Sequence, residues 1–218
     1  MAFAAERSAF EEQRRRMVEV QLRDRGITDQ SVLDAMARVP RHEFAPERFR
    51  SQAYEDHPLP IGEDQTISQP FIVALMLQAL VLQRTDRVLE VGTGSGYVTA
   101  LLCEIADEVV SIERHATLAD EARELLTRLG YIKPKVITGD GSRGYLQRAP
   151  YNAILVSAAA AKVPPALVAQ LAEGGRMILP VGSAETQQLQ VIHKQDGQTQ
   201  IQLRELCRFV PLIASVTK

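Results

Sequence analysis

Between residues 71 and 180, short apolar segments alternate with segments whose apolar residues recur at helical spacing. The apolar segments predict strands at 88–91, 109–113, 135–138, 151–156 and 176–180. The segments around them predict helices at 70–81, 96–105, 116–129 and 164–172. Strands joined by helical crossovers pair in parallel, and the helices then cover both faces of the sheet. We therefore predict an α/β fold, Rossmann-like and doubly wound, with a mostly parallel sheet.

The N-terminal part of the chain has a different pattern. Apolar residues spaced among charged ones predict helices over 6–24 and 29–38, with Gly26 ending the first and Asp29 capping the second. Residues 54–70 contain three prolines and no sustained period, which predicts a loop. Long ordered loops are often functional, so this one is the first candidate for substrate contacts.

The C-terminal part alternates polar and apolar residues in two segments, 187–194 and 199–210. The turn sequence Gln195-Asp196-Gly197 lies between them, which predicts an antiparallel hairpin at one edge of the sheet. We expect one domain over residues 1–218, composed of a helical preface with the substrate loop (1–70), a cofactor-binding core (71–182) and C-terminal antiparallel strands (183–218).

Composition excludes several classes of protein. The 218 residues are 45% hydrophobic and 24% charged with a net charge of -2, so we expect no nucleic-acid or membrane partner. Glu6, Glu11 and Glu12 interrupt any signal peptide, and no segment reaches the roughly 20 apolar residues of a membrane span. We expect a cytoplasmic monomer. Four histidines and two cysteines are scattered without ligand spacing, so we expect no metal.

A glycine-rich turn, within VLEVGTGSGY, follows the first predicted strand of the core. Ligands of open parallel sheets bind beyond the carboxyl ends of the strands, and glycines permit a tight turn and close approach to the backbone. An isolated glycine turn is equally compatible with no ligand. In this position the sequence favours a ligand-binding loop made of Gly92, Thr93, Gly94, Ser95 and Gly96.

Two acidic residues indicate which ligand the loop binds. Glu113 ends the next strand, about 20 residues after the first glycine, where an acid can accept hydrogen bonds from both ribose hydroxyls. The dinucleotide fingerprint needs its third glycine one place later, where this chain has Tyr97. Glu90 would repel a pyrophosphate but would suit an ammonium group. S-adenosylmethionine is a nucleoside that carries one, so we expect it as cofactor.

A second short turn, Gly139-Asp140-Gly141, ends the following strand. It places an acid and exposed backbone where an adenine amino group could be bound. A turn without a ligand is the alternative. We favour adenine contacts by Asp140 and Gly141.

Over about residues 17–213 the sequence resembles the protein-L-isoaspartate O-methyltransferase family. The resemblance rests on V-P-R-H-E-F at 39–44, T-I-S-Q-P at 66–70, the glycine loop, A-P-Y-N-A-I-L-V-S-A-A at 149–159 and R-F-V-P-L at 208–212. The glycine loop is common to many methyltransferases, whereas the T-I-S-Q-P loop is specific to this family. Asn152 departs from the pattern, because the family usually has Asp there.

The resemblance implies the class I S-adenosylmethionine-dependent methyltransferase fold and a repair activity. That activity methylates the α-carboxylate of L-isoaspartyl residues in damaged proteins and peptides, yields S-adenosylhomocysteine and leads to a succinimide. It implies Ser68 as the catalytic hydroxyl and, for the substrate, Ile67, Ser68, Gln69, Pro70 and Val210.

Three alternatives remain at this stage. Thr66 and Ser68 could cap the helix that opens at Pro70 instead of contacting substrate. A methyltransferase of the same architecture could act on a small molecule or on RNA. The fold could also bind the cofactor without catalysing a reaction, although Ser68 and Glu113 are both present.

Overall fold

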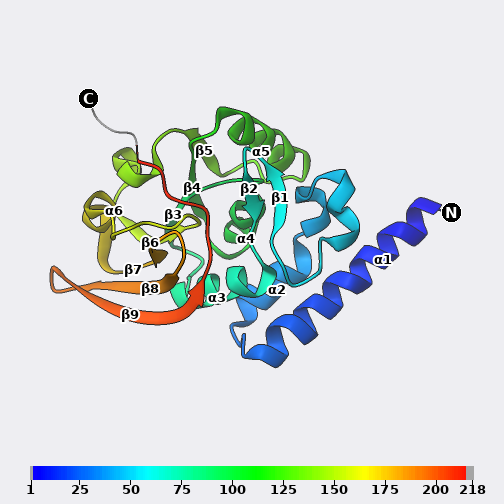
Figure 1. Cartoon of the computed structure of the whole chain (residues 1–218), viewed down its shortest axis with the longest axis horizontal. Coiled ribbons are helices and arrows are strands. Elements are labelled where there is room, and N and C mark those ends of the chain that lie inside the picture. The colour runs from blue at the N-terminus through cyan, green and yellow to red at the C-terminus, as the bar shows by residue number, and fades with distance from the viewer. Residues whose placement is uncertain (1, 215–218) are drawn as a thin grey trace.

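The computed structural model describes residues 2–214, with side chains for residues 8–214. Its centre is a seven-stranded sheet in the order β5-β4-β3-β6-β7-β8-β9 (Figure 1). Strands β3 to β7 pair in parallel, whereas β8 and β9 are each antiparallel to the preceding strand. This confirms the predicted mostly parallel sheet with an antiparallel C-terminal edge. The strands are β3 Arg87–Val91, β4 Glu108–Glu113, β5 Lys135–Thr138, β6 Tyr151–Val156, β7 Leu171–Gly182, β8 Gln187–Gln195 and β9 Gln198–Cys207.

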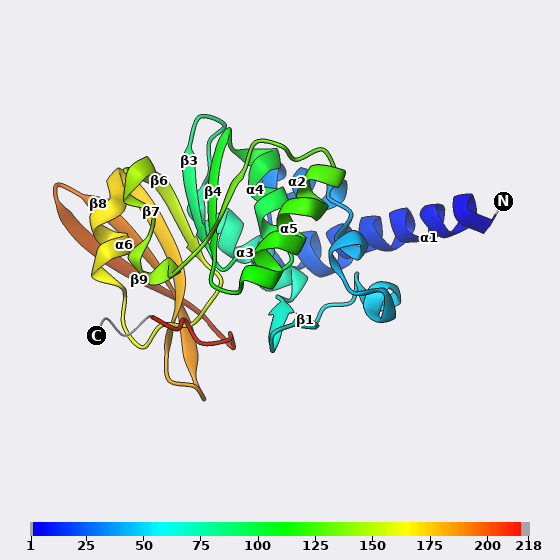
Figure 2. The same cartoon turned by 90° about the horizontal axis from the view of Figure 1, so that it is seen from above.

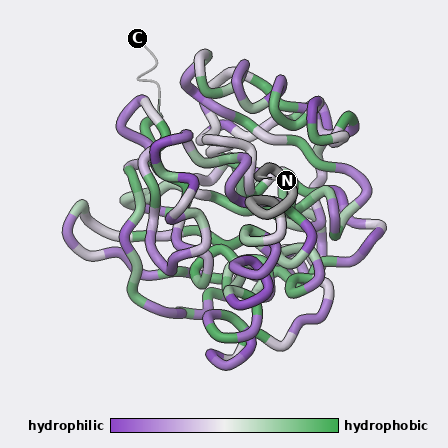
Figure 3. The backbone as a smooth tube through the Cα atoms, turned by 90° about the vertical axis from the view of Figure 1, so that its right-hand side faces the viewer, coloured by the Kyte–Doolittle hydropathy of each residue, from purple (hydrophilic) through white to green (hydrophobic). Residues whose placement is uncertain are grey.

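Helices cover both faces of this sheet, as Figure 2 shows. Alternate strand residues point to opposite faces, so Val88 packs into the core beneath α3 and α4, and Leu89 packs into the core beneath α6. Bands of green and purple alternate along the tube in Figure 3, as expected for elements that are apolar on one side. The helices are α3 Pro70–Leu80, α4 Tyr97–Ile105, α5 Ala116–Arg128 and α6 Pro165–Gln170.

The helical preface forms as predicted. Helix α1 (Ala2–Arg16) projects from the body in Figure 1. It continues through a π-helical segment, η1 (Met17–Leu22), and a 3₁₀ turn, η2 (Arg23–Arg25), to Gly26, which has a left-handed conformation. Helix α2 (Gln30–Arg38) begins after Asp29, whose side chain accepts from the first free amides of the helix. Two 3₁₀ turns follow, η3 Arg41–Phe44 and η4 Glu47–Gln52. Among residues 2–214, no helix is both long and apolar enough for a membrane span.

The prediction of an irregular loop over residues 54–70 is wrong in its central part. Strands β1 (Leu59–Gly62) and β2 (Gln65–Ile67) form an antiparallel hairpin there. Leu59 pairs with Ile67, and both side chains are buried. Strands of four and three residues are too short to show the alternation of apolar and polar residues that marks a strand in a sequence. The hairpin is instead stabilised by the burial of its side chains against the rest of the fold.

Two other boundaries differ from the prediction. The segment predicted as the last helix ends at Gln170, and β7 begins at the next residue instead of at 176. Leu171 pairs with Tyr151 before a bulge shifts the register. A bulge interrupts the two-residue alternation of a strand, so the pattern of apolar residues does not reveal the first part of β7. At the C-terminal end, β9 stops at Cys207, and the chain then leaves the sheet.

Candidate active site

Three strands of the sheet end at the same level. Val91 of β3 is in register with Ile112 of β4 on one side and with Val156 of β6 on the other. The strand order reverses at β3, and such a reversal leaves a crevice outside the carboxyl ends of the strands. The residues that follow these strands therefore meet at one edge of the sheet.

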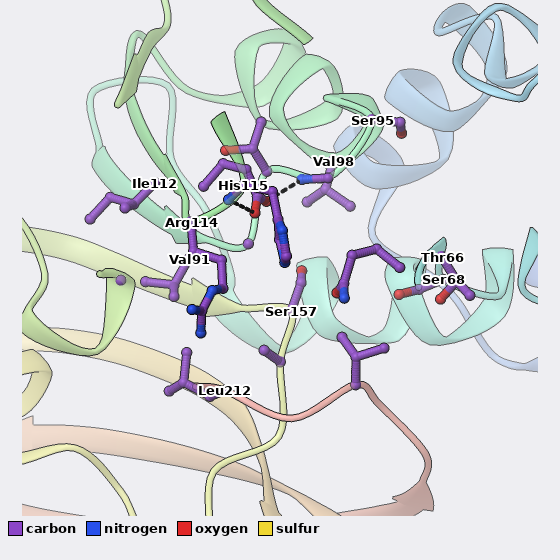
Figure 4. Close-up of a pocket in the computed structure, with 18 of the residues that line it drawn as sticks. Thr66, Ser68, Val91, Ser95, Val98, Ile112, Arg114, His115, Ser157 and Leu212 are labelled. Carbon is purple, nitrogen blue, oxygen red and sulfur yellow. Dashed lines mark hydrogen bonds between the residues drawn. The ribbon is translucent and has the colours of Figure 1, made fainter. Parts of the chain in front are cut away.

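A cavity, here called the glycine-loop pocket, lies at this edge (Figure 4). Its walls come from six separate segments of the chain. They are residues 65–68 with the end of β2, residues 91–95 with Tyr97 and Val98, residues 112–115, the three residues Gly141, Ser157 and Ala158, and residues 210–213.

Glycine is required at two points of the pocket. Gly92 has a φ of 95°, which favours glycine, and its amide donates to the Ile112 carbonyl at 2.8 Å. A Cβ on Gly141 would lie 2.4 Å from Cγ1 of Val91, so any side chain there would have to displace Val91. Both glycines line the pocket.

Glu113 joins the glycine loop to the end of β4. Its side chain is buried, and Oε2 accepts the Gly94 amide at 2.9 Å while Oε1 accepts the His115 amide at 3.0 Å (Figure 4). Each carboxylate oxygen has a second lone pair, and Glu113 lines the pocket. The acid therefore has acceptor capacity left for a ligand.

Glu90 lies beneath the glycine loop and outside the pocket wall. It is fully buried, and its Oε2 accepts from Thr99 Oγ1 at 2.5 Å, whereas Oε1 has no hydrogen-bond partner among the residues that the structure describes. Burial raises the pKa of Glu90 to about 8, so the folded protein holds it as a neutral acid at pH 7. Glu90 therefore does not reach the surface of the pocket, where a ligand ammonium group would lie.

The two predicted adenine residues have different positions. Gly141 lines the pocket. The Asp140 carboxylate accepts from the amide and hydroxyl of Ser142, at 3.0 and 2.7 Å, and so begins a short 3₁₀ turn. The wall at this point is formed by backbone.

A second cavity, here called the tail cleft, adjoins the first. It lies between the start of α3, the loop after β6 and the C-terminal tail. Its walls include Pro58, Gln69, Ile72, Ala159, Ala161, residues 182–184, Gln187 and residues 206–212. The residues that line both cavities are Thr66, Ser68, Ser157, Val210, Pro211 and Leu212.

Hydroxyl groups therefore lie where the two cavities meet. In Figure 4, Thr66 and Ser68 lie side by side on one wall, and Ser157 lies between them and His115. Of the residues predicted to contact substrate, Ser68 and Val210 line both cavities, Ile67 lines the glycine-loop pocket and Gln69 lines the tail cleft. Pro70 is buried at the start of α3 and lines neither.

The tail crosses the cavities as a strap over residues 208–213. Ala159 exchanges main-chain hydrogen bonds of 2.7 Å with Val210 and Leu212. Arg114 donates from Nη1 to the Ile213 carbonyl at 3.2 Å. Ser157 and Arg114 were missed by sequence reasoning, although each directly follows a predicted strand, where the rule for such sheets places ligands.

The capping alternative for Thr66 and Ser68 is wrong. Gln69 is the N-cap residue of α3, and neither hydroxyl caps the helix. Asp56 does this from a distance: Oδ1 accepts the Phe71 amide at 3.3 Å, and Oδ2 accepts from the Gln69 side chain at 2.8 Å. The hydroxyl of Ser68 has no role at this helix end.

Two further residues lie away from the cavities. Asn152 is at the amino end of β6, opposite the site, where Oδ1 accepts the Arg87 amide at 2.9 Å. The side chain of His57 contacts its neighbours Pro58 and Glu55. Within the part of the chain that the structure describes, no cluster of three or more His, Cys, Asp or Glu could hold a metal ion.

Comparison with known proteins gives a consistent result. The sequence profile of the family described as Protein-L-isoaspartate(D-aspartate) O-methyltransferase (PCMT) matches residues 12–217. A protein-L-isoaspartate O-methyltransferase of Koribacter versatilis is 54% identical over 99% of this chain and 97% of its own length. Another, from Methanoculleus marisnigri, is 52% identical over 92% of this chain and 91% of its own length.

Two solved structures have the same fold. A structure named protein-L-isoaspartate O-methyltransferase superposes with a TM-score of 0.83 at 31% identity, over 91% of this chain; the chain spans 65% of that longer protein. A Plasmodium falciparum protein-L-isoaspartate O-methyltransferase, solved in complex with S-adenosyl-L-homocysteine, gives 0.80 at 30% identity, over 92% of this chain and 98% of that one. This chain belongs to the protein-L-isoaspartate(D-aspartate) O-methyltransferase family.

Proposed function

We propose that this protein transfers the methyl group of S-adenosylmethionine to the α-carboxylate of L-isoaspartyl residues in damaged proteins and peptides. The methyl ester then loses its alcohol on attack by the neighbouring main-chain nitrogen, and the resulting succinimide reopens partly to normal aspartate. The observation that carries the proposal is the position of Ser68, which lines both the glycine-loop pocket and the tail cleft. Membership of the family supports the same assignment.

The residues of the glycine-loop pocket fit S-adenosylmethionine. Glu113 has lone pairs for the two ribose hydroxyls, and the backbone at Gly141, which lines the pocket, suits an adenine amino group. Apolar walls at Ile112 and Leu212 suit the flat faces of a purine. The remaining proposed cofactor residues are Gly92, Thr93, Gly94 and Ser95, which line the pocket. Gly96, the N-cap of α4, together with Asp140 and Glu90, lies behind the wall and would act by shaping the residues that line it. When bound, the cofactor supplies an electrophilic methyl group on a sulfonium.

The acceptor needs little activation at this site. A carboxylate with a reference pKa of about 4 is already ionised at pH 7, so no general base is required. The neutral hydroxyl of Ser68 can donate one hydrogen bond that orients the carboxylate without cancelling its charge. Positioning of this kind can contribute on the order of 7–11 kcal/mol to the rate.

The strap supports a position for the substrate. Val210, Pro211 and Leu212 line both cavities, as do Thr66 and Ser68. We place the cofactor in the glycine-loop pocket and the damaged chain in the tail cleft, with Gln69 and Val210 against its main chain. Displacement of water from between the oppositely charged reactants by the bound substrate would favour their mutual neutralisation.

The same geometry discriminates isoaspartate from aspartate. An isoaspartyl linkage routes the main chain through the side-chain carbonyl and leaves the α-carboxylate as a short branch. If the flanking backbone lies in the tail cleft, the carboxylate of a normal aspartate lies one methylene further from the main chain than the α-carboxylate of an isoaspartate. Misplacement by about 1 Å can reduce the rate about 100-fold.

The test uses paired peptides that differ only in Asp or L-isoAsp, with methyl-labelled S-adenosylmethionine. We expect labelling of the isoaspartyl peptide and a kcat/KM at least 100-fold lower for the aspartyl peptide. Equal values would leave only a general carboxyl methyltransferase. Labelling of free small carboxylic acids, with neither peptide modified, would support the small-molecule alternative instead.

A further inference from the structure

Arg41 is the largest side chain that is completely buried, with a relative exposure of 0%. It lies in the 3₁₀ turn η3, outside both cavities. Among the side chains described, residues 8–214, its Nη1 has no hydrogen-bond partner. Burial lowers the pKa of Arg41, and the charge of Asp56 offsets this only in part. A buried cation that lacks a direct ion pair is costly, and an apolar side chain of similar size is often at least as stable. Stability alone therefore does not explain an arginine at this position.

The contacts of Arg41 connect three separate segments. Nε donates to the Ala53 carbonyl at 2.7 Å, and Nη2 donates to the Ser68 carbonyl at 2.9 Å. The guanidinium carbon lies 4.9 Å from the centre of the Tyr97 ring. Tyr97 is the first residue of α4 and lines the glycine-loop pocket. One planar group thus bridges the preface, the Ser68 segment and the helix that follows the glycine loop.

The main chain at Ser68 needs such a support. Ser68 lies after the end of β2 and before Gln69, the N-cap of α3, so it belongs to no regular element. Pro70 follows and has no amide hydrogen. The position of a hydroxyl on this segment depends on how firmly the backbone is held. A shift of about 1 Å at a reacting group can reduce a rate about 100-fold.

We propose that Arg41 is a positioning residue that holds the Ser68 backbone and thereby aims the Ser68 hydroxyl at the junction of the two cavities. It acts through Ser68 and touches neither cofactor nor substrate. The inference rests on the proposed function only in the statement that the Ser68 hydroxyl faces the methyl acceptor; the support of the backbone is independent of the reaction.

The first experiment measures amide hydrogen exchange in Arg41→Met. We expect exchange over residues 59–69 to accelerate at least tenfold, with exchange in β3 and β6 and the midpoint of unfolding unchanged. The matched control is Arg123→Met, because Arg123 also donates from Nε to a main-chain carbonyl, that of Val136, but far from Ser68. Equal exchange over 59–69 in Arg41→Met and the native protein would overturn the proposal.

The second experiment is a double-mutant cycle with Ser68→Ala, read as kcat on the isoaspartyl peptide. Arg41→Met should lower kcat at least tenfold and leave the dissociation constant for S-adenosylmethionine within twofold. The double variant should be no slower than Ser68→Ala alone, because Arg41 acts only through that hydroxyl. Multiplicative losses, or a loss of cofactor affinity as large as the loss of kcat, would overturn the proposal.

Arg41→Lys repeats both experiments if Arg41→Met does not fold. Lysine keeps the charge but lacks the planar fork that reaches two carbonyls at once, so the same acceleration of exchange and the same non-additivity are expected. If the native protein fails to methylate the isoaspartyl peptide, the proposed function fails. The exchange experiment still decides whether Arg41 holds the Ser68 segment.

Discussion

The carboxylate of Glu113 receives two main-chain amides, one from the glycine loop and one from the residue that begins the next connection. It therefore shapes the loop and also offers its remaining lone pairs to a ligand. We therefore expect a replacement of Glu113 to change both the loop and the proposed cofactor affinity.

Glu113→Ala should weaken S-adenosylmethionine binding at least tenfold, because hydrogen bonds to a charged group contribute about 1.5–3 kcal/mol each. Titration calorimetry measures the dissociation constant. Glu124→Ala, which removes an exposed acid of α5, serves as control and should bind normally. An unchanged affinity in Glu113→Ala would show that Glu113 is an ordinary acid at a strand end.

Ser68→Ala should lower turnover on an isoaspartyl peptide at least tenfold, because the hydroxyl that orients the acceptor is lost. Cofactor affinity and the thermal midpoint should remain near the native values, since Ser68 does not cap α3. Steady-state kinetics, calorimetry and a thermal melt separate these effects. A loss of about 1 kcal/mol in the free energy of unfolding, with turnover preserved, would contradict the catalytic role and indicate a structural role for the hydroxyl.

Glu90 makes stability depend on pH. Burial raises its pKa to about 8 from 4.5, so the folded protein binds a proton that the unfolded chain releases between these values. The resulting stabilisation is complete below pH 4.5 and is lost as the pH rises through about 8.

In urea titrations, the free energy of unfolding of Glu90→Gln minus that of the native protein should therefore increase between pH 5 and pH 8, by roughly 3 kcal/mol. Glutamine keeps the shape of the side chain and cannot ionise. A difference that stays constant with pH would mean that Glu90 is already ionised in the folded protein.

At the scale of elements, the start of α3 depends on a residue outside the helix. Asp56 accepts the Phe71 amide and the Gln69 side chain, and it also pairs with Arg25 from the preface. One carboxylate thus links the segment that carries the proposed substrate residues to the N-terminal helices.

Asp56→Ala should lower the free energy of unfolding by about 1 kcal/mol, the usual effect of a lost cap. Thr66→Val, measured in the same urea titrations, should leave stability within about 0.5 kcal/mol, as is usual away from special features. Equal losses in the two variants would argue against Asp56 as the remote cap.

At the scale of the whole molecule, the glycine-loop pocket joins segments from residue 65 to residue 213. A ligand bound there contacts segments that come together only in the folded chain, so its binding energy adds to the stability of the folded state. With S-adenosylmethionine at 100 times its dissociation constant, the gain should be about 2.7 kcal/mol.

A thermal melt with S-adenosylmethionine should therefore show a clear rise of the midpoint, whereas NAD at the same concentration should give none. Glu113→Ala should lose most of the rise at that concentration. Stabilisation by NAD equal to that by S-adenosylmethionine would overturn the choice of cofactor.

The succession of strands and helices along the core could be predicted from the sequence, because short apolar runs and helical spacing are local signals. It also located the glycine loop and Glu113, since in a parallel sheet these positions follow directly from where the strands end. The turn at Asp196 and Gly197 was equally local: both residues have positive φ in the structure.

Which side chains reach the cavities depends on how the elements pack in three dimensions. Glu90 is one residue from the end of β3, yet strand alternation turns it under α4, where Thr99 meets it. The hairpin at Leu59 and Ile67 exists because distant elements bury it, and Arg41 reaches Ser68 from 27 residues away. Such contacts depend on how whole elements pack, and a local pattern carries no information about the partner that a buried side chain will meet.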